Sequence, residues 1–446
     1  MPQISIAARA AAWMGRWGGI LPLLIAEFIL WTGFGALLPV MPLYFTEHGV
    51  EIAFLGVVIA AWPAARLVTE PLFGSLADRT ARVPLMVAGL FVAAASVGAM
   101  AIWTGPLAFV VFRALSGLGT AMYDPAARGY LNDAAPPDRQ GEVFGLYNAA
   151  QMGGILLGPA IGGLGAALFG GYAFVLVFGC LTTLAAALAV AVRVREVRPR
   201  RQADAATSPA PSYSEFPGDP GPHADAVREA GLAAPSSPAS WGDSPSDVHV
   251  PGRPRSLRNR FILAAILANL AGFFGGGIYE TIWALFVTDR GGGVELVGAT
   301  FAIFGLTTIL VSPIGGRIVD RRGPFPFIVG GLLVMVVTMF TYPWVTLPML
   351  YPPLVAVEAI GFSFFGPATY AVIARGTPDG RSSTAQGVLG AAGTVGTIAA
   401  ALATGVLAAV DLNAPFFAGC VVILVLLVAT LLVSGPALRS IRPHGY

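Results

Sequence analysis

Three glutamates stand inside long apolar stretches of the chain and are its clearest candidates for chemistry: Glu27, Glu280 and Glu358. Charged side chains are costly within a membrane and usually face a partner or a water-filled cavity. Burial disfavours the ionised form of a carboxyl, so such a group can hold a proton and release it when its surroundings become wet. We expect the three glutamates to serve a proton pathway, with Glu27 as the first candidate for the coupling carboxyl. A satisfied buried carboxyl is the alternative for each.

Arg113, Arg66 and Glu70 are further ionisable residues within the apolar stretches. Arg66 and Glu70 are four positions apart, so they share a helical face and can form a structural ion pair. Arg113 lies deep in its segment, where an arginine is costly unless it is paired or wetted. It is a second candidate for the proton pathway, and a structural arginine that bonds backbone carbonyls is the alternative.

Aromatic and amide residues share helical faces with these carboxylates. Glu27, Trp31 and Phe34 recur at the spacing of one helical face, and the same holds for Asn269, Phe273 and Glu280. Together with Tyr279, these residues are expected to line an apolar cavity with few polar groups, which suits amphipathic organic compounds. A position in the aromatic belts at the membrane surfaces is the alternative for the aromatic residues.

The elements that must position these residues are membrane-spanning helices. Of the 446 residues, 56% are apolar and 11% are charged, against roughly 25% charged residues in soluble domains. A soluble enzyme is therefore excluded. Twelve mostly apolar stretches reach the length of about 20 residues that a spanning helix needs. They are 18–43, 52–76, 84–103, 106–131, 142–169, 172–193, 260–287, 295–319, 325–346, 348–374, 383–409 and 414–435.

Residues 194–258 separate the first six stretches from the last six and differ from both in composition. They are rich in Pro, Ala, Ser and Asp, and such a segment cannot bury enough apolar area to offset its ordering entropy. We expect a disordered cytoplasmic linker here. It joins an N-terminal six-helix bundle at residues 1–193 to a C-terminal six-helix bundle at residues 259–446.

The arginines predict the orientation of the chain. All 26 basic residues are Arg; Arg290 alone faces outward and Arg66 and Arg113 lie in spans, which leaves 23 on the cytoplasmic side if the N-terminus is there. Lys and Arg accumulate in the cytoplasmic loops of membrane proteins. We therefore expect both termini in the cytoplasm and a multi-pass protein of the bacterial inner membrane.

The two halves of the chain repeat at a constant offset. Gly275 follows Gly33 by 242 residues, and Gly396 follows Gly154 by the same number. A constant offset over this length implies two bundles in parallel repeat, with a shared site between them near the middle of the membrane.

A charged loop motif occurs at corresponding places in the two halves. The first copy contains Gly74, Asp78, Arg79 and Arg82, and the second contains Gly316, Asp320, Arg321 and Gly323. A carboxylate and several guanidinium groups at a tight turn can lock neighbouring helix ends through charge-assisted hydrogen bonds. Asp78 can also sit at the N-terminus of another helix, where the dipole favours an anion. We expect a cytoplasmic gate, and a plain charged turn is the alternative.

The fifth stretch carries small residues and a proline at regular spacing. They are Gly145, Gly154, Gly158, Pro159, Gly162 and Gly163. Small residues four positions apart let two helices approach closely, and a proline bends a helix. We expect this stretch to pack tightly against a neighbour, and generic small-residue packing is the alternative.

With these motifs the chain resembles the major facilitator superfamily, and in particular its twelve-span drug:proton antiporters. The loop from Gly74 is similar to the superfamily marker, and the pattern from Gly154 to Gly163 is similar to the antiporter signature of exporters. The surroundings of Arg113 resemble a span-four motif whose Arg is linked to proton transfer. One departure is Ala81, where the family usually has Gly before the second Arg.

The resemblance implies an all-α membrane protein with twelve transmembrane helices in two pseudo-symmetric six-helix bundles, and transport by alternating access. Three functions stay open. The first is a proton-coupled exporter, or antiporter, of small amphipathic compounds or drugs. The second is a proton-coupled importer or symporter of a nutrient such as a sugar or organic acid, which should show more Asn, Gln and Arg at mid-membrane. The third is a membrane sensor without transport.

We expect no enzymatic activity and no cofactor beyond the proton as coupling ion. The chain has no Lys, so a nucleotide-binding P-loop of the usual type is excluded. Cys180 and Cys420 offer no metal-ligand spacing, and the net charge of +2 is too small to suggest nucleic acid. The expected partners are a small-molecule substrate and membrane lipid, and the expected oligomeric state is a monomer.

Overall fold

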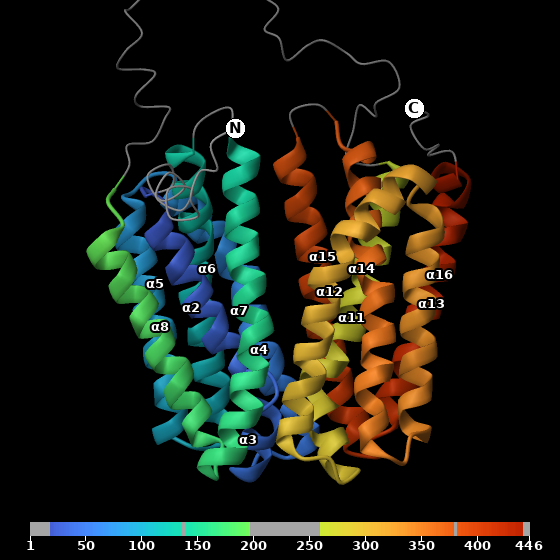
Figure 1. Cartoon of the computed structure of the whole chain (residues 1–446), viewed down its shortest axis with the longest axis horizontal. Coiled ribbons are helices and arrows are strands. Elements are labelled where there is room, and N and C mark those ends of the chain that lie inside the picture. The colour runs from blue at the N-terminus through green and yellow to red at the C-terminus, as the bar shows by residue number, and fades with distance from the viewer. Residues whose placement is uncertain (1–17, 136–138, 197–258, 379–380, 440–446) are drawn as a thin grey trace, which may run out of the picture.

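The structure is a computed structural model that describes residues 18–135, 139–196, 259–378 and 381–439. Within these residues there is no strand, and eleven helices are long and apolar enough to cross a membrane, or twelve if a bent pair counts as one span. Figure 1 shows these helices in two groups, blue to green on the left and yellow to red on the right. This confirms the predicted all-α membrane fold of two bundles. The termini and most of the proposed linker lie outside the described residues.

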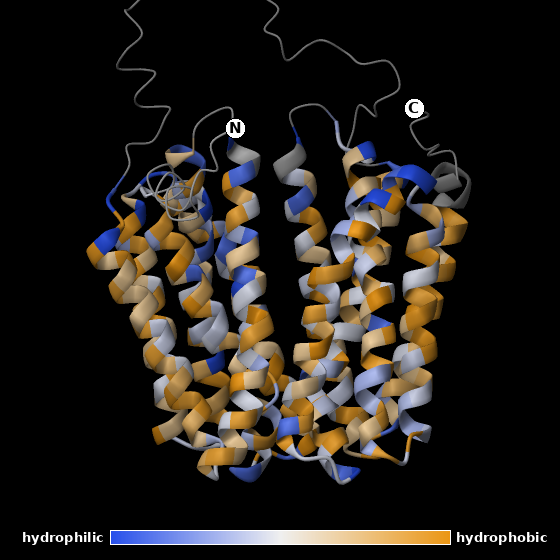
Figure 2. Cartoon of the chain, in the orientation of Figure 1, coloured by the Kyte–Doolittle hydropathy of each residue, from blue (hydrophilic) through white to orange (hydrophobic). Residues whose placement is uncertain are grey.

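The N-terminal bundle contains seven described helices. They are α2 (Leu21–Leu37), α3 (Met41–Glu47), α4 (Ile52–Ala77), α5 (Arg82–Ile102), α6 (Pro106–Ala134), α7 (Gln140–Phe169) and α8 (Ala173–Arg193). The C-terminal bundle contains six described helices. They are α11 (Arg260–Asp289), α12 (Val294–Arg322), α13 (Phe325–Thr341), α14 (Tyr351–Gly376), α15 (Ser382–Ala408) and α16 (Ala414–Arg439). Figure 2 shows hydrophobic residues along the middle of most helices and the hydrophilic ones mainly toward the helix ends, as a membrane requires.

The first predicted span, 18–43, is not one straight helix. It consists of α2 and α3, which meet at an angle of 48°. Pro39 stands in the break, and a proline has no N–H to continue the helical hydrogen bonds. The break carries α3 under the other helices at the lower edge of Figure 1.

The bundles have two ends that differ in how closely they meet. We call the end where α8 stops at Arg193 and α11 begins at Arg260 the linker end, and the opposite end, where α7 stops at Phe169, the far end. A β-carbon placed on Gly163 of α7 at the far end would lie 2.9 Å from the α-carbon of Gly298 on α12. A β-carbon on Gly145, near the linker end of the same helix, would meet nothing within 4 Å. The bundles are thus in backbone contact at the far end and apart at the linker end, as the diverging ribbons in Figure 1 also show.

Candidate functional site

One ion pair joins the two bundles toward the far end. The Nη2 atom of Arg113 on α6 lies 3.7 Å from Oε1 of Glu280 on α11. Arg113 is only 2% exposed, and its Nη2 also donates to the backbone oxygen of Ile59 at 3.3 Å. Because α6 belongs to one bundle and α11 to the other, the pair persists only while the bundles meet at this end.

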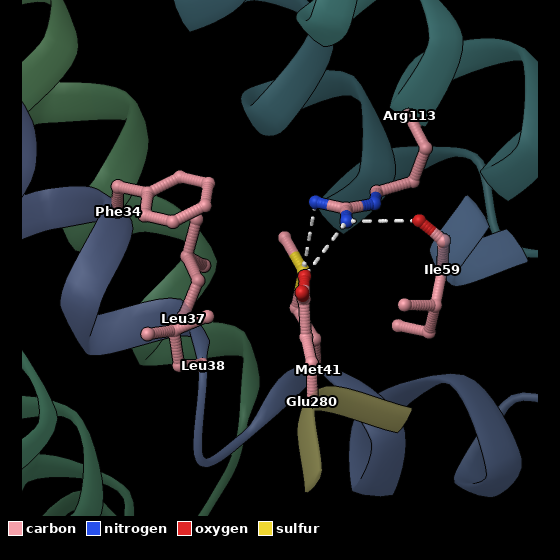
Figure 3. Close-up of a pocket in the computed structure, with 7 residues that line it drawn as sticks. All are labelled: Phe34, Leu37, Leu38, Met41, Ile59, Arg113 and Glu280. Carbon is pink, nitrogen blue, oxygen red and sulfur yellow. Dashed lines mark hydrogen bonds and ion pairs between the residues drawn. The ribbon is translucent and has the colours of Figure 1, made fainter. Parts of the chain in front are cut away.

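A small pocket surrounds this ion pair and is otherwise apolar (Figure 3). Its other lining residues are Phe34, Leu37, Leu38, Met41 and Ile59. The Nη1 atom of Arg113 lies 3.4 Å from the sulfur of Met41. A buried guanidinium left without its carboxylate would be costly in such surroundings. Sequence reasoning selected both Arg113 and Glu280 but did not pair them with each other.

Glu27 lies inside the N-terminal bundle and not on an open face. It is fully buried; its Oε1 accepts a hydrogen bond from Trp31 at 2.8 Å, and its Oε2 accepts one from the hydroxyl of Tyr123 on α6 at 2.7 Å. In this state Tyr123 and Trp31 cover the Glu27 carboxylate, while Phe34 lines the far-end pocket. A proton-coupling role for Glu27 stays a prediction.

The predicted pair of Arg66 and Glu70 is present and has a third member. The Nη2 atom of Arg66 lies 3.1 Å from Oε2 of Glu70 and 2.5 Å from Oδ2 of Asp124 on α6. The same guanidinium lies over the ring of Trp62, 4.9 Å from its centroid. One cation thus ties α4 to α6 by holding two carboxylates. Sequence reasoning missed Asp124, since it lies 58 positions from Arg66.

Glu358 lies in the interior of the C-terminal bundle. It is 3% exposed, and its Oε2 accepts a hydrogen bond from the hydroxyl of Tyr342 at 2.7 Å. Its Oε1 and the hydroxyl of Tyr279 have no hydrogen-bond partner among the described residues. The Tyr279 ring packs edge-on against that of Tyr342, with centroids 6.1 Å apart. Tyr279 thus belongs to an aromatic cluster in this bundle and not to the far-end pocket.

Asn269 has a packing role in the structure. Its side-chain amide donates to the backbone oxygen of Leu389 at 2.8 Å, which ties α11 to α15. Phe273, one turn further along α11, is 43% exposed. Because Glu280 lies on the same helical face and reaches Arg113 of the other bundle, this face of α11 points toward the N-terminal bundle.

The sequence profile of the Major Facilitator Superfamily matches residues 23–357 and 265–445. The chain belongs to this superfamily. Among curated proteins it is similar to the quinolone resistance protein NorA of Staphylococcus aureus (strain MRSA252), with 28% identity over 136 residues, 30% of this chain and 35% of NorA. It is also similar to the staphyloferrin B transporter of Staphylococcus aureus (strain NCTC 8325 / PS 47), with 31% identity over 163 residues, 35% of this chain and 39% of that protein. The chain thus matches little more than a third of the length of these relatives.

Solved transporter structures share the fold over nearly the whole chain. A bacterial homologue of the human lysosomal transporter Spinster, inward-facing and unoccupied, matches with a TM-score of 0.67 and 17% identity over 95% of this chain and 97% of that chain. The nucleoside transporter NupG matches with a TM-score of 0.69 and 14% identity over 93% and 98% of the two chains. At such identities the likeness concerns the fold alone. The superfamily assignment thus rests on the profile match, and the solved transporters add that the chain has their fold.

The superfamily loop motif makes its ion pairs within the N-terminal bundle. Arg82 pairs with Asp133 at the end of α6 and lies 3.8 Å from Asp78, whose side chain is 77% exposed. The carboxylate of Glu196 accepts hydrogen bonds from the backbone N–H groups of Arg82 at 2.9 Å and Val83 at 2.8 Å. These bonds place an anion at the N-terminus of α5, where the helix dipole favours it. Sequence reasoning named Arg82 as one partner for Asp78 and missed Asp133 and Glu196.

The second copy of the motif is built differently. Among the described residues Asp320 and Arg321 form no ion pair, and both are exposed. Gly323 ends α12 with a φ of 81°, a left-handed conformation that favours glycine. Gly74 and Gly316 face equivalent prolines: a β-carbon on Gly74 would lie 3.8 Å from Pro125, and one on Gly316 would lie 4.0 Å from Pro367. The repeat is therefore kept in the packing of the motif but not in its charges.

The antiporter motif of α7 faces two neighbours. β-Carbons on Gly154, Gly158 and Gly162 would lie 2.6, 2.5 and 2.0 Å from backbone oxygens of α2, in the same bundle. On another face, the backbone oxygen of Pro159 lies 2.5 Å from the β-carbon position of Gly298 on α12. The predicted close approach of helices is present along α2 and extends to α12 of the other bundle at Leu156, Pro159 and Gly163. Gly145 takes no part in it in this state.

Proposed function

We propose that the protein is a proton-coupled exporter of small amphipathic organic compounds that works by alternating access in a bacterial inner membrane. The observation that carries the proposal is the ion pair of Arg113 and Glu280, which bridges the two bundles near the closed far end. An ionised carboxylate holds the bundles together there, and a protonated one does not. Opening of the far end breaks the pair and lets Glu280 take up a proton from outside; when the far end closes again, Arg113 displaces that proton toward the open linker end, so a proton enters on each return.

The linker end is the cytoplasmic end in this proposal. Its loops carry most of the arginines of the chain, and Lys and Arg accumulate on the cytoplasmic side of membrane proteins. In the described conformation the two bundles stand apart at the linker end. The protein is then open to the cytoplasm and can receive a compound from there. Protons reach Glu280 from the outside as the far end opens.

Export is the direction that the relatives favour. NorA is named for quinolone resistance, and a transporter gives resistance to a compound by moving it out of the cell. The glycine pattern of α7, which resembles the signature of exporters, supports the same direction.

Reconstituted protein in liposomes with an imposed proton gradient tests this proposal. Accumulation of an amphipathic dye should require the gradient, disappear with a protonophore and resist vanadate. Glu280→Gln should lower the accumulation ratio by about tenfold, within the range typical of coupling between two ligands. It should keep exchange of dye down its own gradient, because glutamine preserves the shape of the side chain but cannot cycle a proton.

Glu27→Gln and Glu358→Gln are the matched controls. Each removes a carboxyl that a tyrosine holds within a single bundle, so neither should uncouple transport as Glu280→Gln does. If Glu280→Gln accumulates dye at the wild-type ratio, Glu280 is not the coupling carboxyl. If Glu27→Gln alone loses uphill transport, the coupling site lies inside the N-terminal bundle instead.

A further inference from the structure

Arg128 is a basic residue inside a transmembrane helix. It belongs to none of the ion pairs described above. It lies on α6, one turn beyond Asp124, and its side chain is exposed. The 23 arginines predicted on the cytoplasmic side include it, although it stands inside the predicted span 106–131, and α6 continues to Ala134. An arginine at such a position is costly unless it faces a partner, water or a ligand.

The neighbours of Arg128 place it on the wall that faces the other bundle. Its largest electrostatic interaction is with Asp124 on its own helix, and it also interacts with Glu70 on α4 and with Tyr147 on α7. These two helices are the ones that meet α15 and α12 of the C-terminal bundle. Since the bundles stand apart at the linker end and the Arg128 side chain is exposed, we expect its guanidinium to face the space between them and to be reached from that end.

Arg128 has electrostatic neighbours but makes no ion pair or hydrogen bond among the described residues. No ion pair or hydrogen bond to its guanidinium is present there. The two nearby carboxylates are engaged, because Arg66 holds Asp124 at 2.5 Å and Glu70 at 3.1 Å. The guanidinium has five N–H donors in a planar fork that matches a carboxylate or sulfonate. These donors are left for a group that comes from outside the protein.

The opposite wall of this space carries no matching charges. The repeat offset of 242 pairs each charged residue of the N-terminal wall with an uncharged one of the C-terminal wall: Arg66 with Thr308, Glu70 with Ser312, Asp124 with Gly366, and Arg128 with Tyr370. The Tyr370 side chain is 58% exposed, and that of Phe273 is 43% exposed. One wall is therefore polar and charged, and the other offers open aromatic surface.

We propose that Arg128 binds an anionic group of the transported compound while Tyr370 and Phe273 contact its apolar body. The substrate class is then an amphipathic organic anion, such as an aromatic carboxylate or sulfonate. This inference rests on the proposed transport function and specifies its substrate. A charge-assisted, two-pronged contact to the guanidinium gives recognition of the anion, and the aromatic wall accepts varied ring systems.

A pair of fluorescent probes that differ in the anionic group tests this inference without any gradient. Anilinonaphthalene sulfonate carries a sulfonate, and N-phenyl-1-naphthylamine has the same ring framework without it. Binding of each to the full-length protein in nanodiscs gives a Kd. Arg128→Gln should weaken binding of the sulfonate probe by about tenfold or more, as expected for loss of a charge-assisted contact. It should change binding of the neutral probe by less than about twofold.

Three further variants separate charge from packing. Arg128→Lys should restore most of the sulfonate affinity, because it keeps the charge. Tyr370→Ala should weaken both probes, and Arg193→Gln, which removes an exposed charge from the end of α8, should weaken neither. Equal affinity of the sulfonate probe for wild type and Arg128→Gln, or equal losses for both probes, overturns the inference. Because no proton gradient is used, this result is independent of whether Glu280 couples transport.

Discussion

The far end and the linker end of the molecule are held by different kinds of contact. At the far end the bundles meet through backbone, with Gly163 against Gly298 and Gly56 against Ala401, and the ion pair of Arg113 and Glu280 lies close by. Near the linker end the strong ion pairs, such as Arg82 with Asp133, stay within one bundle. No described ion pair crosses between the bundles there.

This difference indicates how the protein can move. Where backbones of the two bundles pack directly against each other, without side chains between them, the contact is close and excludes water. Such a contact, which we call a seam, breaks along its whole length or not at all. Near the linker end each bundle keeps its own charges satisfied, so separation there leaves those ion pairs intact. The bundles can therefore rotate relative to each other as rigid units, so that the contact at one end opens while a contact at the other end forms.

Gly163→Leu should have the largest effect, because it places a side chain in the closed seam. Its β-carbon alone would lie 2.8 Å from the backbone oxygen of Val294, so α7 and α12 must part. We expect a shift toward a far-end-open state and loss of transport by tenfold or more, about 1.4 kcal/mol or more in the balance of states. Spin labels at the exposed far-end positions 104 and 410, in a background without Cys180 and Cys420, measure the separation.

Gly145→Leu is the matched comparison, on the same helix near the linker end. A side chain there meets nothing within 4 Å in this state. The far-end distance should therefore stay at its wild-type value, and any cost falls on the state in which the linker end closes. If both leucines lengthen the far-end distance equally, the seam is not what holds that end shut.

The sequence predicts contacts within a helix and its repeats far better than contacts between non-equivalent positions. The pair of Arg66 and Glu70 follows from helical spacing, and the spans and glycine pattern follow from composition and period. The repeat offset compares equivalent positions, whereas Arg113 corresponds to Val355 and Glu280 to Leu38. An ion pair between two unrelated positions leaves no trace in the repeat, so only the packing of the bundles reveals it.

The same limit explains Glu27 and Arg128. Burial of Glu27 depends on Tyr123, which comes from a different helix, so the spacing along α2 alone does not reveal what covers the carboxylate in this state. Arg128 is close to the end of its span in sequence, and the hydropathy pattern does not locate that end to within one turn. Its exposure toward the other bundle depends on how far the bundles have separated.

Asp78→Asn at the linker end should have a smaller effect than a change in the far-end seam. Asp78 is largely exposed and 3.8 Å from Arg82, and an exposed pair of this kind contributes about 1 kcal/mol or less. We expect the fold to be retained and the population to shift modestly toward the state open at the linker end. Spin labels at exposed positions 80, in the loop after α4, and 322, the last residue of α12, measure the distance across that end.

Asp133→Asn is the comparison that separates gating from stability. It removes the well-buried partner of Arg82, and loss of one member of a buried pair costs about 3–5 kcal/mol. This variant should therefore lower the melting temperature, whereas Asp78→Asn should leave it nearly unchanged. An unchanged distance distribution in Asp78→Asn would count against a gating role for the loop at the linker end.

Deletion of residues 203–250 should have the smallest effect of these changes on transport and on the distances at the two ends. This segment lies outside the described residues, and its Pro-rich, polar composition gives it little apolar surface with which to pack. The deletion keeps the arginines on both sides of the linker and Glu196, whose carboxylate caps α5. The transport rate should stay within about twofold of wild type, since long flexible connections contribute little to stability. Both label distances should keep their wild-type distributions. Loss of transport in a deletion protein that inserts and folds normally would mean that the linker takes part in closing the linker end. A shorter deletion that spares either the first or the second half of the segment would then locate the part responsible.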